Sequence, residues 1–454
     1  MTREPAPVSR PVGLTIASSD SGGGAGVQAD LKTMEACGVF GTSVIVATTA
    51  QNTRGVESVH VLPEAEIKAQ YEAITTDFDL GGFKTGMLAT TAVVETVTGY
   101  ARDLDAPLVV DPVMVAASGD RLLEPEGENA YEELVGEATL VTPNADECAA
   151  LTGIDPEGEA SAHEAGEALI EMGADAALIK GGHVPGEMVT DVLVTSEGRK
   201  VFEHPRVETD ATHGSGCTLA SAITARLAAG DALDAAVEDG LALMERAIRY
   251  PLDVGEGPGS VHHHADLRNR AAREPTAEAV ASVVDTLVER DVSPLVPEVG
   301  MNVVGTTPYA ETPSETAAVE GRITRTLSGV NPNRGVRFGA SSHVARFLLA
   351  AREFDPGLRF AVNCRFDGDV EEALDGIGWS VAKYDRSEEP EQVKEADEGT
   401  MGWGARRAFD RSATPVAVID RGEVGKEAIV KLVTTDGETL TERAFSLLDA
   451  LDED

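Results

Sequence analysis

A glycine turn that leads into an alanine-rich stretch is the first feature of this sequence that could do chemistry. It runs Thr212-His213-Gly214-Ser215-Gly216-Cys217, and a predicted helix over 218–225 follows it. Such a turn aims backbone N–H groups at one point, and the helix dipole adds partial positive charge, so the turn suits an anion such as phosphate. Cys217 falls at the helix start, where the pKa of a thiol is usually lowered, which favours a thiolate or a strong hydrogen-bonding partner. A lone Gly-x-Gly is a weak pattern, and an ordinary glycine turn is the alternative.

Further polar residues end or follow apolar segments upstream of this turn. They are Gln51, Asp111, Asn144 and Lys180. The apolar segments are predicted strands that alternate with helices, which predicts an α/β fold whose parallel sheet is covered on both faces. Ligands of such sheets bind beyond the carboxyl ends of the strands, so we expect these residues and the turn at one edge.

These residue types make chemical sense together. Asp111, Asn144 and Glu147 could hold Mg²⁺ directly or through water, because the ion prefers hard oxygen ligands. Lys180 could neutralise a phosphate, and the turn at Cys217 could stabilise a phosphoryl group in transfer, which depends mostly on positioning and electrostatics. Each residue has a structural alternative: a turn for Asp111-Pro112, a helix cap for Asn144 and a solvated edge for Lys180. Together they favour a small-molecule kinase.

The elements that must position these residues can be predicted from the same segments. Predicted strands are 12–17, 42–49, 82–87, 107–114, 139–144 and 176–183, and predicted helices are 27–37, 64–75 and 91–104. A glycine-rich loop, 18–26, joins the first strand to the first helix. It matches a dinucleotide fingerprint only loosely and lacks Walker A spacing, so a flexible connection is the alternative.

Composition limits the possible partners. The chain has 454 residues, enough for two or three domains, with 78 acidic and 37 basic residues and a net charge of -41. This balance repels nucleic acid and anionic membranes, and with only nine lysines it indicates a halophilic, high-salt habitat. The four cysteines lack CxxC spacing, so neither zinc nor a disulfide framework is expected. With no signal-peptide core and no apolar run of about 18 residues, we expect a cytoplasmic location.

Residues 12–266 resemble the hydroxymethylpyrimidine (phosphate) kinases of the ribokinase-like superfamily. The shared segments are SGGGAGVQADLKT, TTAQNTRGV, KTGML, VVDPVM, LVTPNADE, IKGGH, ATHGSGCTLASA and GSVHHH. The resemblance implies a ribokinase-like doubly wound sheet and ATP as co-substrate. The pyrimidine pocket that it implies consists of Asp30, Gln51, Met87 and Val113. It assigns Mg-ATP to Asp111, Asn144, Glu147 and Lys180, and an anion hole to Gly214, Ser215, Gly216 and Cys217. Most ribokinase-like enzymes have an aspartate base where this chain has Cys217.

Two features mark the end of the kinase-like region and the segment after it. His262-His263-His264 could suggest a metal, but three successive histidines cannot all face one ion on a regular element, so the closing turn of the kinase is the favoured interpretation. From Leu267 the chain turns polar, and an amphipathic helix is predicted near 276–290, either as a linker or as the first helix of a second domain.

Residues 293–454 resemble the archaeal-type thiamine-phosphate synthase domain. The shared segments are VPEVGMNVV, EGRITR, VRFGASSHVAR, MGWG and DRGEVGKEAIVK. By position, the essential arginine of that family falls on Arg322 and its essential histidine on His343. The small residues before His343 also suit an anion at a helix start, although a helix cap is the alternative for a single histidine. The resemblance implies a smaller α/β domain that is not a TIM barrel. Related domains occur in transcriptional regulators, with a DNA-binding module that is not expected here.

We therefore expect a tail (1–11), a kinase (12–268), a linker or helix (269–292) and a synthase domain (293–454). The expected activities are phosphorylation of 4-amino-5-hydroxymethyl-2-methylpyrimidine and its monophosphate, then coupling of the diphosphate with thiazole phosphate. The expected catalytic residues are Cys217, Lys180, Arg322 and His343. The alternatives are a pyridoxal kinase and a kinase with a C-terminal thiamine-phosphate-sensing module. The expected partners are small molecules, and the oligomeric state, a homo-oligomer included, is left open.

Overall fold

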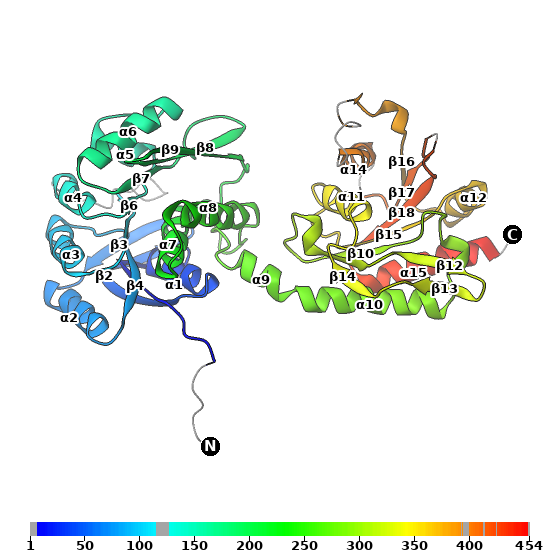
Figure 1. Cartoon of the computed structure of the whole chain (residues 1–454), viewed down its shortest axis with the longest axis horizontal. Helices are drawn as coiled ribbons and strands as arrows, with labels where there is room; N and C mark the ends of the chain where they lie inside the picture. Colours follow the sequence, from blue (N-terminus) through cyan, green and yellow to red (C-terminus); the bar gives the residue numbers. More distant parts are fainter. Residues whose placement is uncertain are drawn as a thin grey trace, which may run out of the picture. The chain divides into compact units, whose positions relative to one another are not determined.

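The computed structural model describes residues 7–114, 127–391, 393, 399–411, 414–423 and 425–452. The chain divides into two compact units, Met1–Asp266 and Leu267–Asp454, which the ribbon of Figure 1 traces from blue to green and from green to red. No helix within these described ranges is both long enough and apolar enough to cross a membrane.

The first unit is built on one sheet. Its strands are β1 (Val12–Asp20), β2 (Phe40–Asn52), β3 (Gly55–Val61), β4 (Leu80–Thr85), β5 (Leu108–Val110), β6 (Leu140–Val141), β7 (Ala176–Ile179), β8 (Met188–Thr195) and β9 (Gly198–Pro205). The order across the sheet is β3-β2-β1-β4-β5-β6-β7-β8-β9, and the strands from β2 to β7 are parallel. The sheet therefore has the predicted doubly wound arrangement.

The two edges of this otherwise parallel sheet carry antiparallel strands. β3 pairs antiparallel with β2, and β8 and β9 continue antiparallel from β7. Only Thr53 and Arg54 separate β2 from β3, and only Ser196 and Glu197 separate β8 from β9. A connection this short can form a hairpin but not a parallel crossover, which needs a dozen or more residues.

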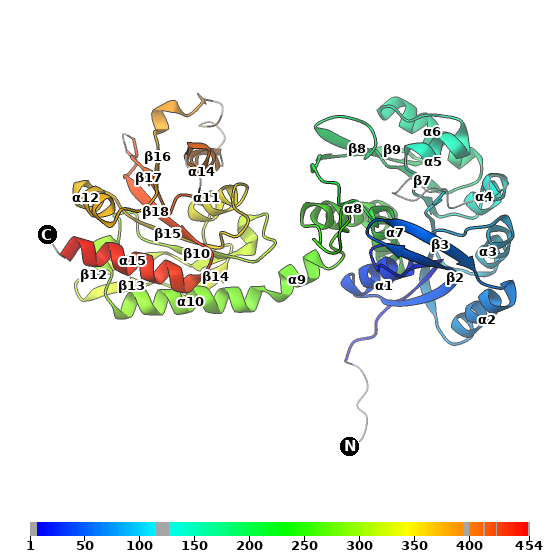
Figure 2. The ribbon, with the colours of Figure 1, turned by 180° about the vertical axis from the view of Figure 1, so that it is seen from behind.

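Helices cover both faces of this sheet (Figures 1 and 2). They are α1 (Gly26–Ala36), α2 (Glu64–Thr75), α3 (Thr91–Asp103), α4 (Gly127–Val135), α5 (Ala145–Thr152), α6 (Glu159–Glu171), α7 (Ser215–Ala228) and α8 (Leu233–Arg249). The predicted helices correspond to α1, α2 and α3. Helices α1, α7 and α8 pack on one face, and α2 to α6 supply the side chains that bury the other.

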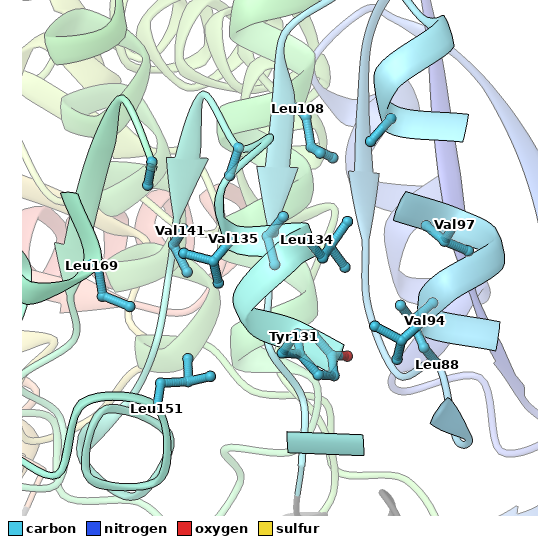
Figure 3. Packing of buried hydrophobic residues seen from close by; sticks show 14 of the residues in the cluster. Leu88, Val94, Val97, Leu108, Tyr131, Leu134, Val135, Val141, Leu151 and Leu169 are labelled. Carbon is cyan, nitrogen blue, oxygen red and sulfur yellow. The ribbon is translucent and has the colours of Figure 1, made fainter. Parts of the chain in front are cut away.

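The larger core holds the parallel strands and helices in place. Figure 3 shows Val94 and Val97 of α3, Leu134 of α4 and Leu108 of β5 as members of this core, with Val94 beside Leu88. These side chains are fully or almost fully buried. Burying one such side chain stabilises a fold by about 1.5–3 kcal/mol. The core therefore fixes the positions of the strand ends and of the loops that follow them.

The second unit has a mixed, mostly antiparallel sheet that does not close into a barrel. Its strands are β10 (Val303–Thr306), β11 (Thr316–Val319), β14 (Val336–Phe338), β15 (Phe360–Arg365), β16 (Val381–Tyr384), β17 (Ala417–Asp420) and β18 (Ile429–Thr434), with a separate hairpin of β12 (Ile323–Thr326) and β13 (Gly329–Pro332). The order is β14-β11-β10-β15-β18-β17-β16. Its helices are α10 (Arg273–Glu289), α11 (His343–Ala351), α12 (Gly368–Ile377), α14 (Gly399–Arg411) and α15 (Gly437–Asp452), with the short η1 (Ser293–Leu295), η2 (Pro313–Glu315) and η3 (Arg386–Glu388). Helices α10, α12 and α15 bury one face, and α11 and α14 the other.

The segment between the two predicted enzymes belongs to the second unit. Val280, Val284 and Leu287 of α10 are buried in its core, so this helix is not a free linker. The short α9 (Ala265–Ala271) precedes it, and Asn269 Nδ2 of α9 donates to Glu315 Oε1 at 2.6 Å.

Candidate active sites

A cavity of about 820 Å³ lies at the carboxyl ends of the parallel strands of the first unit. Most of the residues predicted for the kinase site line it, namely Gln51, Met87, Asp111, Val113, Asn144, Glu147, Lys180, Gly214, Ser215, Gly216 and Cys217. Parallel strands all end at the same edge, which is why residues far apart in the sequence meet here.

A partly buried lysine and two buried carboxylates form the floor of this cavity. Lys180 follows β7, and its Nζ lies 3.1 Å from Asp111 Oδ1 and 3.9 Å from Glu147 Oε2. Burial raises the pKa of Glu147 to about 7, and the negative charge of Asp111 adds to this effect while Lys180 opposes it. Burial disfavours the charged form of Lys180, but Asp111 and Glu147 outweigh it and raise its pKa, so the ammonium stays charged. A fixed positive charge therefore faces the cavity.

The residues expected to hold magnesium differ in whether their oxygen atoms already accept hydrogen bonds within the protein. Asp111 Oδ2 is buried and has no hydrogen-bond partner in the part of the chain that the structure describes. Asn144 caps α5: its Oδ1 accepts from Glu147 N at 3.0 Å, and Glu147 Oε2 accepts from Asn144 N at 2.9 Å. The side chain of Asn144 is thus engaged as a helix cap. Among the described residues, no group of three or more His, Cys, Asp or Glu side chains is arranged to hold a metal ion.

The glycine turn lies beside the charged groups of Asp111 and Lys180. Gly214 has a φ of 83° and immediately precedes α7, whose first-turn N–H groups have no acceptor within the helix. A Cβ atom on Gly216 would lie 3.4 Å from Asp111 Oδ2 and 3.5 Å from Lys180 Nζ. The turn and Lys180 therefore offer backbone donors and a cation to the same point, as an anion hole requires.

The prediction of a lowered thiol pKa at Cys217 is wrong. Burial raises the pKa of Cys217 to about 12, and the positive charge of Lys84 and the N–H of Gly26 only partly offset it. Loss of hydration on burial is thus the largest influence on this thiol. The thiol is protonated near neutral pH and can donate a hydrogen bond, but it is not a thiolate.

Asp30 does not line the cavity, contrary to its expected role in the pyrimidine pocket. Its side chain is fully buried beneath the site. Asp30 Oδ1 lies 3.0 Å from Lys84 Nζ and accepts from Ser221 Oγ at 2.6 Å, and Oδ2 accepts from Thr15 Oγ1 at 2.6 Å. The carboxylate therefore ties α1 to β1, β4 and α7.

Several cavity residues received no role from the sequence. The β8–β9 hairpin contributes Asp191 and His204, whose Oδ2 and Nε2 atoms lie 3.3 Å apart. The hydrogen bond to Asp191 raises the pKa of His204. The β-branched segment 188–195 and the turn after it were signals that could have revealed this hairpin.

The closing histidines lie where the favoured interpretation put them. His262 and His263 are buried in the turn that leads into α9. Burial lowers the pKa of His263 to about 4, so it is neutral near pH 7. Neither belongs to a metal cluster in the described ranges.

The second unit gathers positive charge around His343, the first residue of α11. Partial burial lowers the pKa of His343, and the nearby charges of Arg322, Arg346, Arg386 and Lys431 lower it further. Arg322 is exposed in a turn with a φ of 66°, where its guanidinium donates to the carbonyl of Val299. In a chain of net charge -41, this group of cations creates a local positive potential that can attract an anion.

A buried network supports this cationic cluster. Arg386 binds Asp420 through two hydrogen bonds, of 2.9 Å from Nε and 2.7 Å from Nη2. Tyr384 donates to Asp420 at 2.6 Å, and Lys431 Nζ lies 3.6 Å from the same oxygen. Although burial opposes it, these partners lower the pKa of Asp420 to about 2. The resemblance assigned roles to Arg322 and His343, and Arg346 follows His343 on the same helix start. Asp420 and Lys431 begin and end the shared segment DRGEVGKEAIVK, but neither they nor Arg386 of η3 were given a role.

A doubly wound sheet with a glycine turn, a lysine and carboxylates at its carboxyl edge defines the first unit as a small-molecule kinase of the ribokinase-like class. Comparison with known families is more specific. Residues 20–262 match the phosphomethylpyrimidine kinase family, and residues 279–446 match the family described as thiamine-phosphate synthase ThiN. The chain belongs to the phosphomethylpyrimidine kinase family and carries a thiamine-phosphate synthase domain in its second unit, which confirms the predicted resemblances.

Individual relatives match the first unit over nearly their whole length. The chain is 44% identical over 264 residues to a hydroxymethylpyrimidine/phosphomethylpyrimidine kinase of Streptomyces coelicolor, covering 58% of this chain and 98% of that protein. A protein of the same name from Haemophilus influenzae is 43% identical over 261 residues, with coverages of 56% and 97%. An ADP complex of Bacillus subtilis pyridoxal kinase is similar in structure, with a TM-score of 0.54, 32% identity and coverages of 57% and 99%.

Proposed function

We propose that the first unit transfers the γ-phosphoryl group of ATP to the alcohol of 4-amino-5-hydroxymethyl-2-methylpyrimidine, and then to the monophosphate so formed. The observation that carries this proposal is the convergence of Lys180, Asp111 and the turn at Gly216 in one cavity. Phosphoryl transfer needs positioned donors and cations more than covalent chemistry from the protein.

Each residue has a definite task in this proposal. The ammonium of Lys180 and the N–H groups of Gly216 and Cys217 stabilise the charge on the phosphoryl oxygens. The protonated thiol of Cys217 donates to an oxygen of the reacting group rather than removing a proton. Gln51, Met87 and Val113, which line the same cavity, contact the pyrimidine.

Magnesium fits the carboxylates of the floor. The unpartnered Oδ2 of Asp111 and the carboxylate of Glu147 would hold the ion, in part through water, while Asn144 keeps α5 in place. When bound, Mg²⁺ would offset the negative charge of the nucleotide phosphates.

A pyridoxal kinase is the alternative for the first unit, since the Bacillus subtilis structure has this activity in its name. The pyrimidine kinases are closer in sequence, at 44% and 43% identity against 32%. The test is to assay the purified chain with ATP and each alcohol. A higher kcat/KM for pyridoxal than for the pyrimidine would reverse the assignment.

We propose that the second unit joins the pyrimidine diphosphate to thiazole phosphate and releases pyrophosphate. The cations around His343 support this assignment, because charge builds on the diphosphate as it leaves the methylene carbon. Arg322 can bind phosphate oxygens with two hydrogen bonds and cannot lose its proton. The alternative is a sensing module that binds thiamine phosphate without making it. Formation of thiamine phosphate by the purified chain from both precursors decides between them.

We further propose that both reactions take place in a cytoplasm of high salt content. ATP is available there, and the strongly acidic composition is typical of proteins that stay soluble at high salt.

A further inference from the structure

The glycine-rich loop between β1 and α1, residues 21–25, is folded around one carboxylate. Asp20, the last residue of β1, is only 2% exposed. Its Oδ1 accepts from Gly22 N at 2.7 Å, and its Oδ2 accepts from Gly24 N at 2.9 Å and from Ala25 N at 2.8 Å. Three backbone donors on one side chain give the loop a single shape, so it is not the flexible connection that was one interpretation of its sequence.

This loop lies directly against the glycine turn of residues 214–217, which is the anion-binding turn of the proposed kinase. His213 Nε2, in the residue before Gly214, is 3.2 Å from Asp20 Oδ2. A Cβ atom on Gly24 would lie 2.6 Å from Cδ2 of His213, and one on Gly214 would collide with the carbonyl oxygen of Gly24. The two glycine segments therefore touch through their backbones, and only glycine fits at this contact.

Further hydrogen bonds join the loop to β2, and join Gly26, the residue after the loop, to Cys217. Ser21 Oγ donates to Gln51 O at 2.6 Å and accepts from Gln51 N at 2.8 Å, at the end of β2. The N–H of Gly26 donates to the sulfur of Cys217. Asp20, Gln51 and His213 all line the cavity, so the loop forms part of its wall beside the anion-binding turn.

Nε2 of His213 lies near two polar atoms, Asp20 Oδ2 at 3.2 Å and Gln51 Nε2 at 3.3 Å. A carboxylate only accepts hydrogen bonds, so His213 binds Asp20 in the form that carries a proton on Nε2. Burial opposes ionisation of Asp20, but the hydrogen bonds from His213, Ala25 and Gly22 outweigh it and lower its pKa. The contact is therefore a charge-assisted hydrogen bond, which is stronger than one between neutral groups.

We propose that Asp20 and His213 are positioning residues whose hydrogen bond, called the clasp below, holds the glycine-rich loop against the anion-binding turn. This arrangement directs the phosphoryl group to the bound alcohol and not to water. In the productive reaction the alcohol oxygen bonds to the γ-phosphorus, the bond from that phosphorus to the β–γ bridging oxygen breaks, and the alcohol proton is released. When the hydrogen bond between Asp20 and His213 is lost, a water oxygen takes the place of the alcohol oxygen. ATP then gives ADP, inorganic phosphate and a proton. A closed wall prevents this side reaction because it keeps water from the phosphoryl group.

The test measures coupling in the full chain with ATP and a saturating amount of the pyrimidine, without thiazole phosphate. The readout is the ratio of ADP formed to phosphoryl groups transferred to the pyrimidine, which a merely structural change in rate would not alter. The parent ratio should be near one. Asp20→Asn and His213→Ala should raise it several-fold, whereas His213→Gln, which keeps a donor, should stay closer to the parent. Asp231→Asn, on the surface of the same unit, is the control.

A ratio near one in both Asp20→Asn and His213→Ala, whatever their rates, overturns the proposal. If Asp20→Asn does not fold, His213→Ala decides the question, because the side chain of His213 is 22% exposed and its loss removes less of the core. The inference rests on the proposed kinase activity, and a parent chain that does not phosphorylate the pyrimidine would count against that activity and not against the clasp.

Discussion

Lys84 Nζ lies 3.0 Å from Asp30 Oδ1, and both side chains are fully buried. Burial disfavours the charged form of Lys84, but Asp30 outweighs it and raises the pKa of the lysine, so the pair is ionic. This ion pair joins β4 to α1 beneath the cavity of the first unit, where a charge without a partner would be costly.

Lys84→Met should therefore destabilise the chain strongly. Removing one partner of a buried ion pair costs about 3–5 kcal/mol, because the other charge remains buried. The measurement is the free energy of unfolding of the first unit from a urea titration. Lys68→Met is the control, since Lys68 pairs with Glu72 on the surface of α2 at 3.7 Å; it should change stability by less than about 1 kcal/mol. Equal effects in the two variants would show that Asp30 loses its charge or finds water.

Cys217→Ala should lower kinase turnover on the order of 10²-fold, the usual cost of one lost donor at an anion hole. Thermal unfolding should change little, because one sulfur is lost from a site that lines a cavity. Iodoacetamide should modify Cys217 slowly at pH 7, since burial raises its pKa to about 12. Near-normal turnover in the variant would assign the stabilisation to the backbone N–H groups alone.

Glu147 should make stability depend on pH. Burial raises the pKa of Glu147 from its ordinary value of 4.5 to about 7, so the folded chain holds a proton that the unfolded chain has released between these values. The stabilising contribution is complete below the lower value and is lost as the pH rises through the upper one, by at most about 1.4 kcal/mol per pH unit. The stability of the parent relative to Glu147→Gln should fall between pH 5 and 8. Glu171→Gln, an exposed site on α6, should show no such trend.

The two units should fold separately when the chain is cut between Asp266 and Leu267. Expression of 1–266 should yield a kinase and 267–454 a synthase. A cut after residue 270 should give a less stable second unit, because it separates Asn269 from Glu315. The measurements are solubility, circular dichroism and the two activities. Insoluble halves would mean that each unit needs the other to fold.

Arg322→Ala and His343→Ala should each abolish formation of thiamine phosphate while kinase activity stays intact. Arg322 loses its bond with the diphosphate, and His343 loses a donor within the cationic cluster. The measurement is thiamine phosphate formed from both precursors, beside ADP release with the pyrimidine alone. Arg268→Ala, at an exposed position of α9, is the control. A variant that couples at the parent rate would favour the sensing module.

Much of the kinase site could be predicted from sequence because it depends on local patterns. Apolar segments predict the strands, and a Gly-x-Gly before an alanine-rich segment predicts a helix N-terminus. Asp111 and Lys180 both follow such strands, and the ends of parallel strands must meet at one edge, so their proximity follows from topology.

Only the tertiary structure decided which of these residues face the cavity and in what charge state. The family resemblance assigned Asp30 to the pyrimidine pocket. In the folded chain its carboxylate pairs with Lys84 and does not line the cavity. Cys217 has the local setting of a reactive thiol, but burial raises its pKa instead. The clasp between Asp20 and His213 joins positions 193 residues apart. Local pattern determines which elements form, whereas burial and charge at a site depend on neighbours that come together only when the chain folds.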